Sequence, residues 1–191
     1  MPYWEEKTKN YSNLEIIWGD FLKNKSKLPK GDYKVAANLP YQITSKIMRF
    51  FLESDNPPTE MSVLVQKEVG ERICAKDGRQ SILSLSVAYY AEPKIISNVQ
   101  AKSFFPRPKV DSVVLYLKLK PQKDKEFFKL FFQVLKTGFS SPRKMLFKNL
   151  SAMVSKEKLK TVFSQLKIDE KIRPERLSFS EWNSLVKLIN Q

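Results

Sequence analysis

Four consecutive residues, Asn38-Leu39-Pro40-Tyr41, place an amide, a rigid turn and an aromatic ring directly after the apolar residues 33–37. The exocyclic nitrogen of adenine is a poor nucleophile because its lone pair is delocalised into the ring. Acceptors for the two amino hydrogens would localise that pair, and the Asn38 side-chain oxygen and the Leu39 carbonyl could serve. Pro40 has a φ fixed at about −65° and would hold both acceptors ready. The motif therefore predicts methylation of adenine N6.

The aromatic ring of the motif has a matching use. Tyr41 could stack on the base, an interaction worth about 1–3 kcal/mol with single-stranded nucleic acids. This route needs neither histidine nor metal, and the chain contains no histidine. Asn and Pro are also common turn residues, so the motif alone fits an ordinary strand-to-loop transition equally well. Other segments of the chain are needed to choose between adenine recognition and an ordinary turn.

Composition indicates a polyanionic partner. The chain has 191 residues, enough for one large domain or a large and a small one, and 42% of them are hydrophobic. The formal net charge is +14, and Lys and Arg recur along the whole chain. No stretch approaches the ~20 apolar residues of a membrane-spanning helix, and no N-terminal signal pattern is present. We expect a cytoplasmic protein that binds nucleic acid and no membrane.

Cysteine usage limits the possible sites. The single cysteine, Cys74, excludes an intramolecular disulfide, and without histidine a Cys/His zinc site is also excluded. Cys74 falls in a segment with helical periodicity and is interpreted as a packed apolar residue, not a nucleophile. We expect no metal.

Hydrophobic periodicity predicts alternating strands and helices in the first half of the chain. Strands are expected at residues 14–18, 33–37 and 61–66, and helices at 45–52 and 68–75. This alternation predicts a mainly parallel α/β sheet. A further helix at 82–91 precedes strands at 95–99 and 110–119, which we expect to form an antiparallel pair closing the sheet.

The character of the chain changes at Pro121. Residues 125–136 carry a phenylalanine-rich stripe at helical spacing, interpreted as packing, and helices are expected at 157–166 and 181–189. The sequence thus predicts two domains, a catalytic domain at 1–120 and a helical C-terminal domain at 121–191. Asp20 and Asn38 each follow a predicted strand, and ligands of parallel sheets bind at the carboxyl ends of strands. Both residues are therefore expected to face one cleft.

Taken together, four separated segments resemble the rRNA adenine N6,N6-dimethyltransferase family, enzymes that use S-adenosylmethionine to methylate two adjacent adenosines near the 3′ end of small-subunit rRNA. The segments are residues 38–41, residues 65–75, the loop 104–112 with the sequence FFPRPKVDS, and the C-terminal residues 139–150 and 168–178. The resemblance implies the C-terminal part of a Rossmann-like methyltransferase sheet followed by a small all-α domain. It also implies a monomer that acts on the small ribosomal subunit.

The resemblance implies roles for individual residues. Asn38 and the Leu39 carbonyl would hold the target N6, with Tyr41 on one face of the adenine and Phe104 on the other. Asp20 would accept a hydrogen bond from the adenine amino group of S-adenosylmethionine, with the Phe21 backbone N–H beside it. Two plainer readings stay open, because Asp20 could be only a helix cap and Phe104 could be core.

Four basic residues are candidate RNA contacts. Arg107 and Lys109 lie in the loop that carries Phe104, and Arg143 and Lys144 lie in the predicted helical domain. Arg and Lys commonly bind phosphate oxygens, although each of these could equally be a solvated surface charge.

One expected part of the family pattern is not found. The glycine-rich loop that wraps the methionine moiety of the cofactor should lie upstream of Leu14, but the thirteen residues before Leu14 contain no glycine. At about 30 residues per βαβ unit, two strands and their helices are expected to be absent. We therefore predict that this chain alone binds S-adenosylmethionine weakly or not at all.

Three alternative functions stay open. A large-subunit rRNA adenine methyltransferase of the macrolide-resistance type would share the chemistry, although Leu39 and residues 173–178 favour the small-subunit enzyme. A DNA adenine methyltransferase is disfavoured because such enzymes usually carry Asp or Asn followed by two prolines. A non-catalytic RNA-binding or ribosome assembly factor would keep the basic surface without cofactor chemistry.

Overall fold

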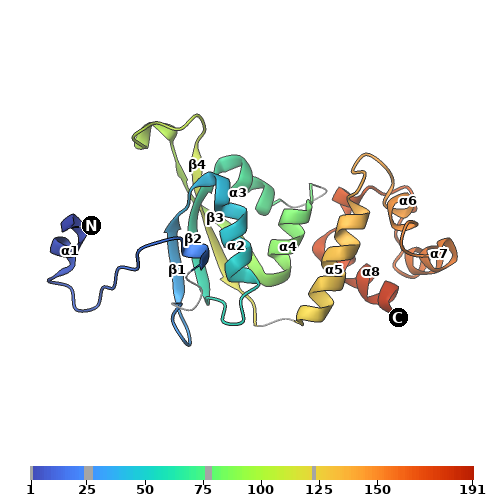
Figure 1. Cartoon of the computed structure of the whole chain (residues 1–191). Coiled ribbons are helices and arrows are strands. Elements are labelled where there is room, and N and C mark those ends of the chain that lie inside the picture. Colours follow the sequence, from blue (N-terminus) through green and yellow to red (C-terminus); the bar gives the residue numbers. More distant parts are fainter. Residues whose placement is uncertain (1, 24–27, 76–78, 122–123) are drawn as a thin grey trace. The chain divides into compact units, whose positions relative to one another are not determined.

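The structure is a computed structural model that describes residues 2–23, 28–75, 79–121 and 124–191 (Figure 1). The chain divides into two compact units, Met1–Lys30 and Gly31–Gln191, and each is described by itself. Among its described residues, the first unit contains helix α1 (Pro2–Thr8) and the 3₁₀ turn η1 (Phe21–Lys23).

The strand expected at residues 14–18 is wrong. The structure has no regular element there, and Leu14, Ile17 and Trp18 are exposed. A strand is defined by backbone pairing with a neighbour, and within the described residues this segment pairs with none. A short apolar run satisfies the periodicity of a buried strand without supplying that partner.

The second unit is built on a four-stranded sheet. Its strands are β1 (Lys34–Asn38), β2 (Glu60–Gln66), β3 (Ala91–Val99) and β4 (Ser112–Leu119), in the spatial order β1-β2-β4-β3. β1 and β2 are parallel, whereas β4 runs antiparallel to both β2 and β3. The predicted antiparallel pair is thus confirmed. The prediction of a mainly parallel sheet is wrong for these strands, because β4 also pairs antiparallel with β2.

Three helices cover one face of this sheet: α2 (Thr44–Leu52), α3 (Lys67–Ile73) and α4 (Ile82–Tyr90) (Figure 1). The strands alternate accordingly, so that Met61, Val63 and Val65 of β2 are fully buried and the residues between them are partly exposed. The apolar stripe predicted for α2 is confirmed. Ile47, Met48, Phe51 and Leu52 are all buried.

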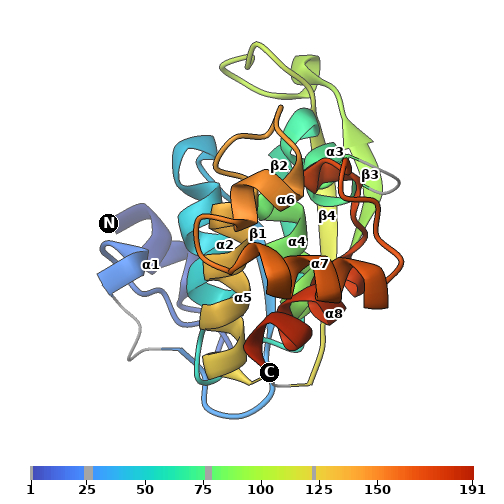
Figure 2. The ribbon, with the colours of Figure 1, turned by 90° about the vertical axis from the view of Figure 1, so that its right-hand side faces the viewer.

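The C-terminal residues form a second helical layer made of α5 (Lys125–Gly138), α6 (Leu146–Leu150), α7 (Lys156–Gln165) and α8 (Phe179–Asn190). Figure 2 views this layer in front of α2 and α4, which lie between it and the sheet. The capping pattern explains where two of the helices begin. The Asp124 carboxylate accepts the N–H groups of Glu126 and Phe127, and Ser178 forms a capping box with Glu181.

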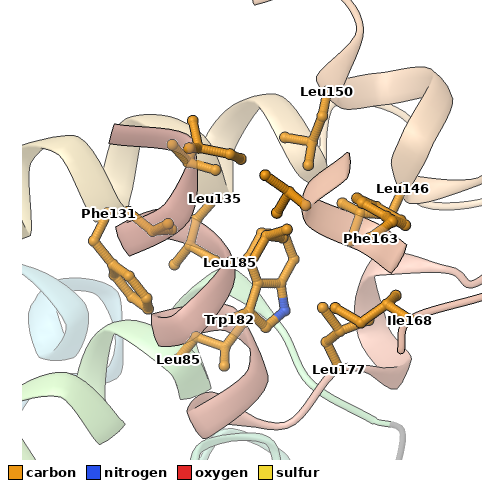
Figure 3. Packing of buried hydrophobic residues seen from close by; sticks show 14 of the residues in the cluster. Leu85, Phe131, Leu135, Leu146, Leu150, Phe163, Ile168, Leu177, Trp182 and Leu185 are labelled. Carbon is orange, nitrogen blue, oxygen red and sulfur yellow. The ribbon is translucent and has the colours of Figure 1, made fainter. Parts of the chain in front are cut away.

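Trp182 of α8 lies at the centre of the helical core, fully buried among side chains from all four C-terminal helices (Figure 3). Its indole N–H donates to the Pro174 carbonyl at 3.2 Å, which satisfies its polar atom. The predicted packing role of the phenylalanine stripe is confirmed, because Phe128 and Phe131 belong to the same core.

This core crosses the predicted domain boundary. Leu85 and Tyr89 of α4 belong to the same buried cluster as the C-terminal helices, and the Tyr89 hydroxyl donates to the Asp124 carbonyl at 2.9 Å. Residues 31–191 consequently form one compact unit. The division into domains at residue 120 stays a prediction.

Candidate active site

Asn38 is the last residue of β1, at the carboxyl end of an edge strand of the described sheet. It lies opposite Leu64 of the parallel neighbour β2. Its side chain is exposed, and it forms no hydrogen bond to another residue that the structure describes. The amide is therefore positioned where a sheet of this type binds ligands.

A sharp turn follows Asn38. Leu39 buries its side chain, which anchors the backbone at this point, and Pro40 has a φ of −58°, close to the value that its ring imposes. The Pro40 carbonyl accepts hydrogen bonds from the Ile43 N–H at 3.0 Å and the Thr44 hydroxyl at 3.3 Å. These bonds start the 3₁₀ turn η3 (Tyr41–Ile43) and fix the path of the chain away from the Asn38 amide.

Tyr41 is half-buried at the start of η3. Its hydroxyl lies 2.7 Å from the hydroxyl of Ser112, the first residue of β4, and either atom could be the donor. The polar end of the ring is thus fixed to the sheet.

A long loop at the same end of the strands, between β3 and β4, completes the site. It follows β3, forms the 3₁₀ turn η4 (Ala101–Ser103) and returns into β4 (Figure 1). Phe104 is half-buried and Phe105 is fully exposed. Pro106 and Pro108 follow, and both restrict the backbone. The reading of Phe104 as a loop residue agrees with this placement.

The Asn38 turn and this loop form the two sides of one open cleft of about 350 Å³. The cleft is lined by Asn38, Leu39, Pro40, Tyr41, Phe104, Phe105, Pro106 and Pro108. All five residues predicted as catalytic are therefore brought together. Every lining residue is uncharged, and aromatic rings occur on both sides, which suits a flat neutral base better than a phosphate or a sugar.

The four candidate RNA contacts lie in two places. Arg107 and Lys109 are exposed on the loop that carries Phe104. Arg143 and Lys144 are exposed in the segment between α5 and α6, away from the lining of the cleft. Asn149 shapes that segment, because its buried amide donates to the carbonyls of Gly138 and Ser141 at 2.6 and 3.1 Å.

Asp20 and Phe21 belong to the first unit, so their predicted position beside Asn38 stays a prediction. Both residues are exposed. One Asp20 carboxylate oxygen accepts the Leu22 N–H at 3.0 Å, and the Asp20 carbonyl accepts the Lys23 N–H at 3.1 Å. Asp20 therefore caps η1, as the plainer reading of this residue anticipated.

Sequence reasoning missed part of the cleft. Phe105, Pro106 and Pro108 line it, and their place in the loop motif beside Phe104 was the available signal. Ser112 was also missed as the partner of Tyr41. The two residues are 71 positions apart, so no local pattern could have paired them.

A hollow of about 410 Å³ lies elsewhere in the second unit, with Arg49, Phe128 and Phe132 among its walls. None of the predicted catalytic residues lines it, so the site is assigned from its chemistry and not from its volume. Among the described residues, no group of three or more potential metal ligands is close enough to hold an ion. None of the helices in these described residues has the length and hydrophobicity that spanning a bilayer requires.

The chain resembles known proteins along its whole length. The family model described as ribosomal RNA adenine dimethylase matches residues 1–191. Ribosomal RNA small subunit methyltransferase A of Clostridioides difficile is 34% identical over 202 residues, covering 100% of this chain and 70% of the relative. The protein of the same name from Dehalococcoides mccartyi is 38% identical over 192 residues, covering 94% and 64%. The chain thus spans about two thirds of the length of these curated relatives.

Two solved structures share the fold. The crystal structure of the 23S rRNA methyltransferase ErmE aligns with a TM-score of 0.79 at 20% identity, covering 100% of this chain and 78% of that one. A dimethyladenosine transferase from Plasmodium falciparum aligns with a TM-score of 0.76 at 26% identity, covering 95% and 74%. The predicted Rossmann-like methyltransferase fold is confirmed, and so is the family resemblance. The chain belongs to the ribosomal RNA adenine dimethylase family.

Proposed function

We propose that this protein transfers methyl groups from S-adenosylmethionine to N6 of two adjacent adenosines near the 3′ end of small-subunit rRNA. The observation that carries the proposal is the cleft in which Asn38 meets aromatic rings from two separate segments, Tyr41 and Phe104. An amide acceptor and two aromatic rings in one cleft offer what the amino group and the two faces of a flat base would require.

The target adenine has to leave its stack to enter the cleft, as in other enzymes that modify bases. Tyr41 and Phe104 would hold its two faces, which offsets the lost stacking. The Asn38 oxygen and the Leu39 carbonyl would then accept the two N6 hydrogens and raise the electron density on nitrogen. β1 and Pro40 fix the backbone that carries both acceptors, so the Leu39 carbonyl is held in place before the reaction.

S-adenosylmethionine, when bound, supplies an electrophilic methyl group. The residues of this chain fit that cofactor in part: the Asp20 carboxylate could accept from its adenine amino group, and the Phe21 N–H could donate to the ring. Asn38 lies at the carboxyl end of β1, where it could contact both the cofactor and the target. After transfer, N6 carries a proton in excess, which can pass to water through the open side of the cleft.

Two observations support the small ribosomal subunit as substrate. The two curated relatives cited above are named as small-subunit rRNA methyltransferases, and the net charge of +14 suits a large RNA. Arg107 and Lys109 are next in sequence to residues that line the cleft, and Arg143 and Lys144 would extend the contact to phosphates further away. We propose a cytoplasmic monomer that docks on this ribonucleoprotein particle.

The experiment is methyl transfer to unmodified small and large ribosomal subunits, supplied separately, with S-adenosylmethionine at millimolar concentration. The expected product is N6,N6-dimethyladenosine in small-subunit rRNA, detected by mass spectrometry of nucleosides. Product in the large subunit alone would favour the alternative enzyme of that subunit. No product from a folded chain that binds RNA would favour the non-catalytic assembly factor.

A further inference from the structure

Ser112 connects the two sides of the cleft, although it does not line the cleft itself. It is 0% exposed and occupies the first position of β4, directly after the loop that carries Phe104. Its hydroxyl lies 2.7 Å from the Tyr41 hydroxyl, on the side of the cleft formed by the Asn38 turn. One buried hydroxyl is therefore tied to Tyr41 by a hydrogen bond and to the Phe104 loop by the chain.

The neighbouring Asp111 closes the base of the same loop. Its carboxylate accepts the Ala101 N–H at 2.9 Å, which joins the second and last residues of the loop. Its backbone carbonyl accepts the Lys67 N–H at 3.0 Å, which attaches this base to the start of α3. The loop thus has an exposed tip at Phe105 and a closed base at Asp111.

Register in the sheet explains why these bonds fix the cleft. Ser112 pairs with Gln66 of β2 on one side and with Val99 of β3 on the other, so it cannot move without disturbing three strands. A hydrogen bond to such a residue restrains the Tyr41 ring much more than a bond to a mobile surface group would.

We infer that Ser112 and Asp111 are positioning residues that set the separation between Tyr41 and Phe104, and thereby the ability of the cleft to grip a base. This inference rests on the proposed function, because it assumes that the cleft receives an adenine. Neither residue touches the base. Ser112 acts through the Tyr41 hydroxyl, and Asp111 acts through the backbone of the loop.

The test is a double-mutant cycle on base-dependent RNA binding. The probes are an oligouridine that carries one central adenosine and the same RNA with an abasic site at that position, both followed by fluorescence anisotropy. For the wild-type chain, the adenosine probe is expected to bind about tenfold more tightly, since one stacked base contributes that order of affinity. Ser112→Ala is expected to lower this preference to threefold or less.

Tyr41→Phe removes the same hydrogen bond by deleting the Tyr41 hydroxyl, and it keeps the aromatic ring. It should lower the preference as much as Ser112→Ala does, and the double variant should be no worse than either single variant. If Ser112→Ala fails to fold, Tyr41→Phe still tests the role of this hydrogen bond. Ser97→Ala, which changes an exposed serine of β3, is the matched control and should leave the preference unchanged.

Three outcomes separate the proposals. Coupled losses support the positioning role of Ser112. A preference that survives Ser112→Ala, or that falls by the same factor with and without the Tyr41 hydroxyl, overturns the inference and leaves the proposed function standing. A wild-type chain with no preference for the adenosine probe overturns both, because the cleft would then not recognise a base.

The role of Asp111 can be tested separately, by hydrogen exchange of the Ala101 amide. Asp111→Ala should raise the hydrogen exchange rate of the Ala101 amide at least tenfold, because that N–H loses its acceptor. Asp111→Asn keeps an oxygen in the same place and should restore most of the protection. Equal exchange in all three proteins would show that Asp111 does not close the loop.

Discussion

Candidate side chains of the site could be predicted from the sequence where they lie next to one another in the chain. Asn38, Leu39, Pro40 and Tyr41 could be assigned together because they are contiguous and follow an apolar strand. Their chemical types specify what they could bind. The partner of Tyr41 could not be predicted, since a hydrogen bond across 71 positions depends on strand order and not on sequence spacing.

Asn149 shows the same limit in a different part of the chain. The family resemblance includes this residue, but only the structure explains it: its buried amide donates to the carbonyls of Gly138 and Ser141. Asn149→Ala should lower the free energy of unfolding by about 2 kcal/mol, because two carbonyls lose their donor. Asn149→Asp should cost more, since a buried carboxylate cannot donate to them.

Equilibrium urea unfolding measures both effects. Asn98→Ala is the control, because Asn98 is exposed on β3, and it should change stability by no more than about 0.5 kcal/mol. Similar stability of the Asn149 and Asn98 variants would contradict the structural role of the amide.

Helices and strands were predicted well wherever periodicity and partners agree. The helix expected at residues 45–52 corresponds to α2 because its apolar positions meet a sheet that the chain itself provides. The prediction of a strand at residues 14–18 is wrong for the opposite reason, because this apolar segment pairs with no strand among the described residues. The antiparallel β2–β4 pairing was also missed, because strand order is not encoded in the period of any one strand.

Helix packing leads to a prediction at Gly138, the last residue of α5. A methyl group there would lie 2.5 Å from Trp182 Cη2 and 2.9 Å from Leu146 Cδ1, both buried in the core. Gly138→Ala should therefore destabilise the chain by about 1–2 kcal/mol, despite the better helix propensity of alanine. Gln133→Ala, on the exposed side of α5, is the control, and thermal unfolding of the two variants measures the difference. A Gly138→Ala variant more stable than wild type would refute this packing.

Loss of the capping box at the start of α8 should lower stability less than Gly138→Ala does. Ser178 accepts the Glu181 N–H at 3.3 Å, and the Glu181 carboxylate accepts the Ser178 N–H at 2.7 Å. Ser178→Ala should lower the free energy of unfolding by about 1 kcal/mol, and Ser178→Asp should retain most of it. An unchanged denaturation midpoint for Ser178→Ala would show that α8 is held by its core contacts alone.

Charge acts on the molecule as a whole. A net charge of +14 is spread along the chain, so RNA affinity should fall steeply as salt displaces Lys and Arg from phosphates. Replacing both Arg143 and Lys144 with alanine should reduce the slope of log K against log salt by about 2, at about 1 for each phosphate contact. The control pair, Lys158 and Lys160 of α7, should leave the slope unchanged. A lower slope for the Lys158 and Lys160 variant, with no change for the Arg143 and Lys144 variant, would place the RNA contact on α7 instead.

The central claim concerns the cleft formed by Asn38, Tyr41 and Phe104, and its most direct test is the single-turnover rate of methyl transfer to small subunits. Asn38→Ala should lower that rate by about 10²–10³, the usual loss when one preorganised group that stabilises developing charge is removed. The matched control Asn98→Ala should react like the wild type. Dimethyladenosine formed by Asn38→Ala at the wild-type rate would contradict the account, because the amide would then have no part in activating N6.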